Sequence, residues 1–460
     1  MENYKVRIKD VTISNFMNIR KGFLSFINPN RDYLMSILGL YGQNGSGKTA
    51  LINALDILKS ALSGQAIPSA YGDCISVGYD CSSFTYTFLL TKDGNTSEEV
   101  IYSFSIRPHT DSTHCNEGNP SLIIFNEVLK ARLYREKDER IGRIIDTSSE
   151  DMVYPKSKKE LLFGKRNDDR LSAIRKNAEV KSGSFIFSDE LLLLIEERKE
   201  TSDEISEFYY SLLKSLSSFG SDSFFVINTS NNALIAMNAE PLNFKLGKGG
   251  GTIAVPIEGK TVFPESEIPL IREILDKINI VLKTIIPGLT VSLDILGQNT
   301  LYTGEKGVLI LLMSERNGIR VPFSRESEGI KKLVSILQLL TSIFNNPGVT
   351  VAIDELDTSI FEYLLGEILS ILSEAGQGQL IFTAHNLRPL ETLDKGFIAF
   401  TTTDLDNRFI RMKKIRETNN LRNTYFRNIF LNENYDNLYQ ETRNSEITMA
   451  FYEAGGCFDE

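Results

Sequence analysis

Residues Gly42–Thr49, which read GQNGSGKT, decide the fold of this chain. They match the pattern G-x-x-x-x-G-K-[ST], a glycine-rich loop whose backbone N–H groups surround phosphates. The apolar run Leu34–Tyr41 before the loop predicts a buried strand, and residues 50–58 after it have the apolar spacing of a helix. A strand, a glycine loop and a helix in this order are the context that the pattern requires, so we predict a nucleotide-binding site here.

The residue types of this loop suit phosphate binding. Glycines permit the tight turn, and the start of the helix presents unpaired N–H groups and a positive dipole end to an anion. Lys48 is predicted to contact the β- and γ-phosphates, and Thr49 to place its hydroxyl on Mg²⁺. A glycine-rich turn that matches by accident is the alternative interpretation, and the flanking strand and helix argue against it. The predicted nucleotide-binding residues are Gly42, Asn44, Gly45, Ser46, Gly47, Lys48 and Thr49.

Composition narrows the class of protein. Of the 460 residues, 42% are hydrophobic and 24% charged, which is typical of a globular chain long enough for two or three lobes. The net charge of −10 argues against coating nucleic acid by bulk charge, although local basic patches stay open. No apolar run approaches the roughly 20 residues that span a bilayer. The N-terminus has no apolar signal core, so we expect a cytoplasmic protein without a membrane contact. The 3 histidines and 4 unpatterned cysteines predict neither a zinc nor a redox site.

A second group of motifs lies far downstream of the loop. A predicted apolar strand ends at Asp354 and Glu355, and the carboxyl edge of a parallel sheet is where ligands bind. Asp354 is predicted to hold Mg²⁺, and Glu355 to orient and deprotonate an attacking water. Another strand ends near a lone His385, a candidate hydrogen-bond donor to the γ-phosphate or the water. Ser327 and Gly329 begin an amphipathic helix with exposed N–H groups. Taken singly, these motifs also fit acidic or capped helix starts and a surface histidine.

The order of these motifs resembles one class of ATPase. Gly42–Thr49, Ser327–Gly329, Asp354–Glu355 and His385 together resemble the ABC-type ATPases of the SMC/OLD-like branch, which includes compact prokaryotic ATPases of antiphage defence systems. The resemblance covers residues 1–59 and 320–400. It implies ATP and Mg²⁺ as cofactors and a head-to-tail dimer. In such a dimer the signature residues Ser327 and Gly329 of one copy would contact the γ-phosphate held by the other, so an isolated subunit would hydrolyse ATP poorly.

Some residues depart from the pattern of that class. Glu328 stands within the signature, and because a carboxylate near phosphates is unfavourable, we expect it to point away. Ile360–Phe361 occupies the place where many members carry Leu-His, which leaves communication between subunits through this loop open. A glutamine-loop residue cannot be assigned, and Gln65 is only in the right general region. The long heptad-rich segments of a chromosome-maintenance protein are absent from the sequence.

The resemblance and the periodicities together predict an α/β fold. Its parts would be a phosphate-loop ABC-type ATPase head with a mixed or antiparallel β lobe, a parallel core sheet, and a large, mainly helical insertion. The predicted divisions are residues 1–134 for the N-terminal half of the head, 135–300 for the insertion with a charged arm, 301–400 for the C-terminal half of the head, and 401–460 for an accessory region.

Two functions remain open at this point. The first is an ATP-hydrolysing sensor or scaffold, a homodimer or higher homo-oligomer, that regulates a separate effector, a nuclease, in prokaryotic antiphage defence. The second is an SMC/RecF-like ATPase that binds DNA in repair or maintenance. Residues 408–416 interleave basic and apolar side chains, which predicts an edge strand whose basic face is either a nucleic-acid or partner surface or a solvated strand face. Gly247–Gly251 is either a flexible loop or a second phosphate loop.

Overall fold

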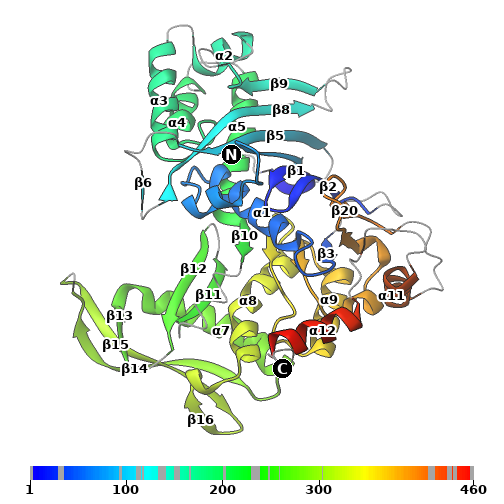
Figure 1. Ribbon diagram of the computed structural model, residues 1–460. Helices are drawn as coiled ribbons and strands as arrows, with labels where there is room; N and C mark the ends of the chain where they lie inside the picture. The colour runs from blue at the N-terminus through cyan, green and yellow to red at the C-terminus, as the bar shows by residue number, and fades with distance from the viewer. Residues whose placement is uncertain are drawn as a thin grey trace.

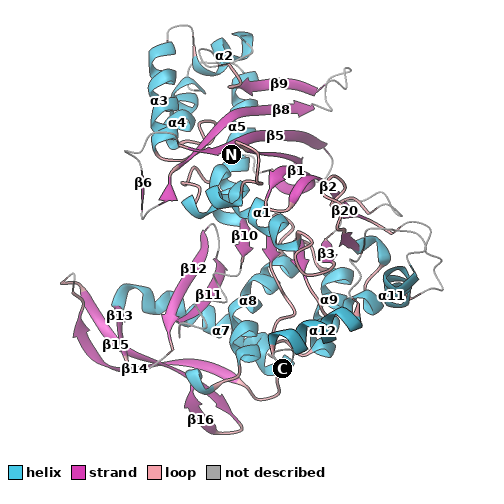
Figure 2. Cartoon of the chain, in the orientation of Figure 1, coloured by secondary structure: helices cyan, strands magenta, loops and turns pink. Residues whose placement is uncertain are grey.

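The structure of the chain is a computed structural model. It describes residues 4–28, 36–92, 96–109, 115–116, 119–132, 141–149, 156–164, 167–199, 204–228, 239–246, 249–257, 260–302, 304–412, 420–431, 438 and 443–455. Two six-stranded sheets form most of the head, and a smaller lobe with its own sheets extends from it (Figure 1). Helices cover these sheets, as the colouring by secondary structure makes plain (Figure 2). The predicted α/β class is therefore confirmed.

The first sheet is antiparallel, with the strand order β2-β1-β4-β5-β8-β9. In β1, alternate apolar side chains such as Val11 and Ile13 are buried while the intervening Thr12 is half-buried, as period-2 patterning requires. A bulge between Ile8 and Asp10 shifts the pairing with β4. The strands span Lys5–Phe16 (β1), Ile19–Ser25 (β2), Ser82–Lys92 (β4), Thr96–Pro108 (β5), Leu122–Arg132 (β8) and Ile141–Asp146 (β9), with the short pair β6 (Cys115–Asn116) and β7 (Asn119–Pro120) beside them.

The second sheet holds the parallel core that the sequence predicts. Its strand order is β10-β17-β18-β3-β19-β20, parallel throughout except for the antiparallel edge strand β20. Its inner strands are buried along their whole length, which explains their continuous apolar sequences. The strands span Ile37–Tyr41 (β3), Phe224–Ile227 (β10), Thr350–Ile353 (β17), Gln379–Thr383 (β18), Ile398–Thr401 (β19) and Phe409–Ile410 (β20).

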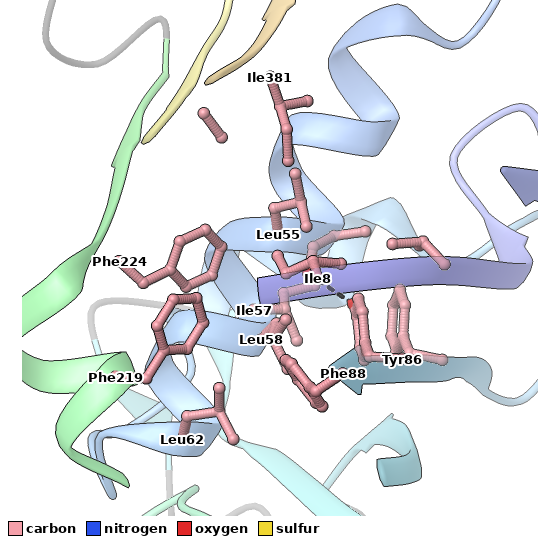
Figure 3. Close-up of a cluster of buried hydrophobic side chains, with 14 of the residues drawn as sticks. Ile8, Leu55, Ile57, Leu58, Leu62, Tyr86, Phe88, Phe219, Phe224 and Ile381 are labelled. Carbon is pink, nitrogen blue, oxygen red and sulfur yellow. Dashed lines mark hydrogen bonds between the residues drawn. The ribbon is translucent and has the colours of Figure 1, made fainter. Parts of the chain in front are cut away.

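Helix α1 (Lys48–Leu62) forms the centre of the largest core. Figure 3 shows its side chains Leu55 and Leu58 between residues of the first sheet, such as Ile8, and Phe224 of the core sheet. The Tyr86 hydroxyl of β4 donates to the Ala54 carbonyl at 2.6 Å, so this buried polar group is also satisfied. Each leucine buried here contributes on the order of 2 kcal/mol. The helix that begins at the phosphate loop is thus held rigidly on both sides.

The described residues between β9 and β10 are mainly helical. It contains α2 (Lys156–Phe163), α3 (Asp168–Val180), α4 (Asp189–Lys199), α5 (Glu204–Ser218) and the single π-helical turn η3 (Phe219–Ser223). Strand β10 follows immediately and belongs to the core sheet, although it falls inside the predicted insertion 135–300. Strand β14 ends at Thr300, beside the predicted division at 300, and pairs with β15 beyond it. The four predicted divisions of the chain stay predictions.

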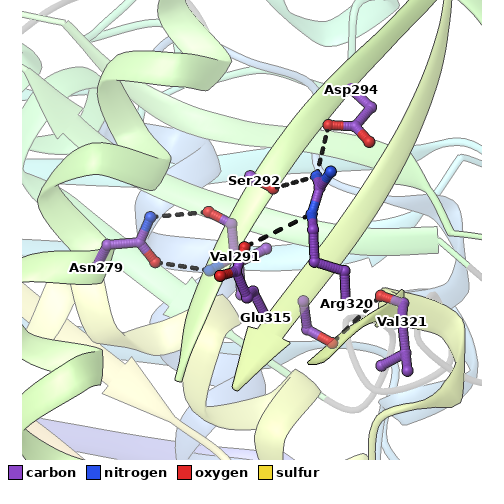
Figure 4. A network of polar contacts seen from close by, with 8 residues as sticks. Asn279, Val291, Ser292, Asp294, Glu315, Arg320 and Val321 are labelled. Atoms are coloured by element: carbon purple, nitrogen blue, oxygen red, sulfur yellow. Dashed lines mark hydrogen bonds and ion pairs between the residues drawn. The ribbon is translucent and has the colours of Figure 1, made fainter. Parts of the chain in front are cut away.

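The smaller lobe has a hydrophobic core of its own. The Asn279 side chain of α7 accepts a 2.8 Å hydrogen bond from the Val291 N–H and donates another of 2.8 Å to the Val291 carbonyl, which attaches the helix to the following strand. Arg320 forms an ion pair with Asp294 at 2.8 Å, which links two strands of this lobe (Figure 4). The elements are β11 (Ala239–Leu246), β12 (Gly249–Pro256), β13 (Thr261–Pro264), η4 (Glu265–Glu267), α7 (Ile268–Ile285), β14 (Thr290–Thr300), β15 (Lys306–Arg316), β16 (Ile319–Pro322), η5 (Phe323–Arg325) and α8 (Glu328–Asn345). Gly249–Gly251 belongs to strand β12, which pairs antiparallel with β11, so both the flexible loop and the second phosphate loop are wrong for these three residues; residues 247–248 lie outside the described part.

The C-terminal elements correct one prediction. The edge strand expected over 408–416 covers only β20, and 413–419 lie outside the described residues. Arg408 is 2% exposed and donates to the Thr402 carbonyl at 2.6 Å, while Arg411 donates to the Ser25 carbonyl at 2.7 Å. Their charges therefore tie backbone segments together rather than forming a basic surface. The remaining elements are η1 (Ser69–Cys74), α9 (Glu362–Ala375), α10 (Pro389–Thr392), η6 (Lys395–Phe397), α11 (Leu421–Leu431) and α12 (Asn444–Ala454). Among the described helices, none is long and apolar enough to cross a bilayer.

Candidate nucleotide-binding site

The glycine-rich loop connects β3 to α1, as its sequence context predicts. Gly45 and Gly47 have φ angles of 75° and 99°, a region that favours glycine. A Cβ on Gly42 would lie 1.9 Å from the Thr401 hydroxyl, so only glycine fits there. Helix α1 begins without a side-chain cap, which leaves its first N–H groups available to an anion. Lys48 donates to the carbonyls of Gly42 and of its neighbour at 2.8 and 3.0 Å, so its ammonium lies across the loop.

Neighbouring strands hold the loop in place. The Ser46 hydroxyl donates to the Gln43 carbonyl at 2.5 Å and shares a short hydrogen bond with the Thr401 hydroxyl at the end of β19. On the opposite side, the Asn18 side-chain amide donates to the Gly45 carbonyl from the turn between β1 and β2. Asn18 and Thr401 were not predicted as site residues, because their partners depend on which strands are neighbours. The loop is consequently pre-organised by its own Ser46 and by residues from two other segments.

The two predicted carboxylates follow β17. Asp354 is 1% exposed, and its Oδ1 accepts a 2.6 Å hydrogen bond from the Thr383 hydroxyl of β18. Its Oδ2 is buried and has no hydrogen-bond partner among the described residues. The Glu355 backbone N–H donates to the same Thr383 oxygen at 2.8 Å, and Glu355 has a φ of 49°, a strained backbone that is often found at functional sites. Thr383 therefore fixes both acidic residues at once.

His385 follows β18 and is held through its backbone. Its N–H donates to Asp357 Oδ2 at 2.8 Å, and the next N–H, that of Asn386, donates to the same oxygen at 2.5 Å. The loop after β17 and the loop after β18 are also joined by the Leu356 N–H, which donates to the Thr383 carbonyl at 3.0 Å. Asp357 and Thr383 are site residues that the sequence analysis missed.

One cavity of about 620 Å³ brings these predicted residues together. A volume of this size is ordinary for a nucleotide-sized ligand. The lining residues are Met17, Asn18, Asn44, Gly45, Gly47, Lys48, Thr49, Ala50, Asp354, Glu355 and His385. Of the predicted nucleotide-binding residues, Gly42 and Ser46 stand behind this lining and shape the loop. The site thus unites three segments that are far apart in the sequence.

Two buried lysines face the carboxylates. Burial lowers the pKa of Lys48, and the charges of Asp354, Glu355 and Asp357 oppose this shift. Lys332 of α8 is 3% exposed, and burial lowers its pKa against the same three carboxylates. Lysines whose pKa is lowered by burial beside several carboxylates are typical of a functional site.

The donor set fits Mg²⁺. The unpaired Oδ2 of Asp354 and the hydroxyl of Thr49 are oxygen ligands of the type that Mg²⁺ prefers, and both residues line the cavity. Within the described ranges, no group of three or more histidine, cysteine, aspartate or glutamate side chains could hold a metal by itself. Mg²⁺ characteristically binds through one or two protein oxygens together with substrate phosphates and water, which agrees with this sparse set.

The signature residues lie at the start of α8. Ser327 caps the helix, its hydroxyl accepting from the Ile330 N–H at 3.4 Å. A Cβ on Gly329 would lie 2.2 Å from the carbonyl oxygen of Ser359, so the helix start packs directly on the loop that follows Glu355. Glu328 pairs with Lys331 of its own helix at 3.1 Å. Neither Ser327 nor Gly329 lines the cavity described above, and their contact with a nucleotide held by another copy stays a prediction.

The other residues that the sequence analysis discussed, Gln65, Ile360 and Phe361, do not line the nucleotide cavity. Phe361 is 71% exposed at the start of α9, while Ile360 is buried at 8%. The Leu-His position is therefore occupied by one core residue and one exposed aromatic residue.

Comparisons with known proteins assign the chain to a family. The sequence profile of the family described as "AAA domain, putative AbiEii toxin, Type IV TA system" matches residues 37–391. No curated protein matches the chain. Among solved structures, the SMC head domain from Pyrococcus furiosus bound to the C-terminal domain of ScpA is similar, with 13% identity, a TM-score of 0.38, and coverage of 88% of this chain and 96% of that one. The SMC head domain from Thermotoga maritima has 12% identity, a TM-score of 0.38, and coverage of 89% and 100%. The recombination mediator protein RecF has 12% identity, a TM-score of 0.35, and coverage of 88% and 99%.

Proposed function

Because the chain belongs to the family described as "AAA domain, putative AbiEii toxin, Type IV TA system", we propose that it is an ATPase that hydrolyses Mg²⁺-ATP to control a partner effector in prokaryotic defence. The observation that carries this proposal is the single cavity that joins the phosphate loop to Asp354, Glu355 and His385. These groups are the parts that hydrolysis of a bound triphosphate needs: a cradle, a metal ligand, a base and a donor.

The roles follow from the geometry. The ammonium of Lys48, which lies on the loop carbonyls, turns to the β- and γ-phosphates when they enter. Mg²⁺, when bound by Asp354 and Thr49, neutralises charge on the phosphate oxygens. Glu355 accepts a proton from the attacking water, and His385 donates a hydrogen bond to the γ-phosphate or that water. Asp354 and the backbones of Glu355 and His385 are fixed before substrate arrives, so little reorganisation of these groups accompanies the reaction.

We further propose that the working unit is a homodimer. Ser327 and Gly329 stand outside the cavity of their own subunit, next to the loop that carries Glu355, which supports a contact with the nucleotide of a second copy. In that arrangement each copy supplies part of the charge stabilisation for the other. We propose that this dimer works in the cytoplasm.

The contacts of the basic residues near position 408 favour a separate effector over direct action on DNA. By analogy with the class, this effector would be a nuclease. Arg408 and Arg411 hydrogen-bond to the chain's own carbonyls, which removes two of the charges that a nucleic-acid surface would need there. The net charge of −10 works in the same direction. The family description, which names a toxin of a toxin–antitoxin system, also supports a defence role.

The decisive experiment compares wild type with Glu355→Gln. We expect the variant to bind ATP normally, to hydrolyse it about 100-fold or more slowly, as loss of a general base predicts, and to accumulate as an ATP-dependent dimer in sedimentation analysis. Ser327→Arg is the matched control: it should bind ATP and remain monomeric. Wild-type turnover in Glu355→Gln would refute the role of the glutamate, and an ATP-dependent dimer of Ser327→Arg would refute the contact between copies. Salt-sensitive binding of DNA by the chain alone, with faster hydrolysis, would favour the repair function instead.

A further inference from the structure

Asp357 makes an unusual pair of contacts two residues beyond Glu355. One of its oxygens, Oδ2, accepts hydrogen bonds from two successive backbone N–H groups, those of His385 at 2.8 Å and Asn386 at 2.5 Å. Both donors belong to the loop after β18, whereas Asp357 belongs to the loop after β17. Hydrogen bonds from N–H groups to an ionised carboxylate are roughly twice as strong as neutral ones. The carboxylate therefore clamps one catalytic loop to the other.

The backbone around Asp357 is built to aim this carboxylate. Glu355 and Ser359, two residues before and after it, have backbone φ angles of 49° and 64°, which residues other than glycine seldom adopt. Two tight backbone hydrogen bonds close the loop: the Thr358 N–H donates to the Glu355 carbonyl at 3.1 Å, and the Ile360 N–H donates to the Asp357 carbonyl at 3.2 Å. Strain of this kind persists only where the surrounding contacts fix the conformation, and such positions cluster at functional sites.

The second oxygen of Asp357 faces inward. Its Oδ1 is buried and has no hydrogen-bond partner among the described residues, and the same holds for the hydroxyl of Tyr41, the last residue of β3 before the phosphate loop. Burial is the main cause that raises the pKa of the Tyr41 hydroxyl, and the negative charge of Asp357 raises it further. Asp357 is thus held by the loop that carries His385 through one oxygen, while its other oxygen is buried.

We propose that Asp357 is a positioning residue for ATP hydrolysis: its carboxylate fixes the backbone of His385 and thereby holds that side chain at the nucleotide. The proposal rests on the function proposed above, since it assigns Asp357 a role that is exercised through His385. No contact of Asp357 with the nucleotide is required, and Asp357 does not line the cavity. A purely structural carboxylate would stabilise the fold without this dependence on one side chain.

A double-mutant cycle tests the proposal. We expect Asp357→Ala to lower kcat for ATP about tenfold or more while KM changes less than about twofold, because orientation in the transition state is lost and ground-state binding is kept. In a His385→Ala background, Asp357→Ala should cause no further loss of kcat, since the side chain that it positions is gone. Asp357→Asn, which retains an acceptor oxygen, should recover part of the lost rate.

A second readout does not depend on activity. In hydrogen–deuterium exchange, Asp357→Ala should speed the exchange of a peptide covering residues 384–388. Asp394→Ala is the matched control, because the Asp394 carboxylate also accepts a backbone hydrogen bond, a local one from the Gly396 N–H at 2.7 Å, and does not line the cavity; it should leave kcat and the exchange of 384–388 unchanged.

Several results would overturn the inference. Losses of kcat that multiply in the double mutant would mean that Asp357 acts by another route, and an unchanged exchange rate of 384–388 would remove the clamp. If His385→Ala alone keeps the wild-type kcat, the proposed role of His385 fails first, and the inference fails with it. If His385→Ala is slow but Asp357→Ala is not, only the inference fails.

Discussion

Replacement of Thr383 by valine tests how the two carboxylates are held. The side chain is fully buried, and valine has nearly the same shape. The change removes the hydroxyl that donates to Asp354 Oδ1 at 2.6 Å and accepts from the Glu355 N–H at 2.8 Å. A hydrogen bond to a charged group contributes about 1.5–3 kcal/mol, and a buried N–H left without a partner costs about 1–3 kcal/mol. We therefore expect Thr383→Val to lower the free energy of unfolding by about 3 kcal/mol.

The matched control for this prediction is Thr350→Val. Thr350 is equally buried, but it lies at the opposite end of β17, and its hydroxyl donates one neutral hydrogen bond to Gln379 at 3.3 Å. Its loss should cost about 1 kcal/mol or less. Urea titration gives both stabilities, and a phosphate-release assay gives both rates: Thr383→Val should also slow ATP hydrolysis at least about tenfold, because Asp354 and Glu355 lose their shared anchor, whereas Thr350→Val should not. Equal destabilisation by the two variants, or wild-type hydrolysis by Thr383→Val, would refute the reasoning.

Three further predictions concern single sites. Lys48→Ala should abolish binding of a fluorescent ATP analogue in a titration, and an unchanged affinity would remove the assignment of the loop. Gly329→Ala should destabilise the protein by about 1–3 kcal/mol in urea, since its Cβ would lie 2.2 Å from the Ser359 carbonyl, whereas Gly297→Ala, whose Cβ meets nothing within 4 Å, should change little. Burial raises the pKa of the Glu127 carboxyl in the folded protein above its value in the unfolded chain. The stability that this group contributes is therefore present below the unfolded pKa and is lost as pH rises through the folded pKa. Glu127→Gln should flatten the melting temperature across this pH range, and an unaltered profile of melting temperature against pH would contradict the prediction.

The sequence predicted the individual elements well where their pattern was local. The helix expected over residues 50–58 lies within α1, and the apolar strand expected directly before Asp354 is β17. Glycine chemistry and strand context also placed the phosphate loop between β3 and α1. These features follow from the periodicity or the backbone needs of a few neighbouring residues.

The sequence failed where the structure depends on which strands are neighbours. Thr383 and Asp357 act across the boundary between β17 and β18, and Thr401 acts from β19 on the phosphate loop. A hydroxyl or carboxylate at a strand end gives no local signal of such a partner. Arg408 and Arg411 misled for the same reason: they donate hydrogen bonds to the carbonyls of Asn18 and Ser25, which are distant in the sequence.

The central claim is that one nucleotide binds between segments that are hundreds of residues apart in the chain. A crystal structure with Mg²⁺ and a non-hydrolysable ATP analogue tests it most directly. We predict the triphosphate on Gly42–Thr49, with the metal ion between the Thr49 hydroxyl and Asp354 and with Glu355 facing the γ-phosphate. An analogue bound elsewhere on the chain, or a metal ion out of reach of Asp354, would contradict the account.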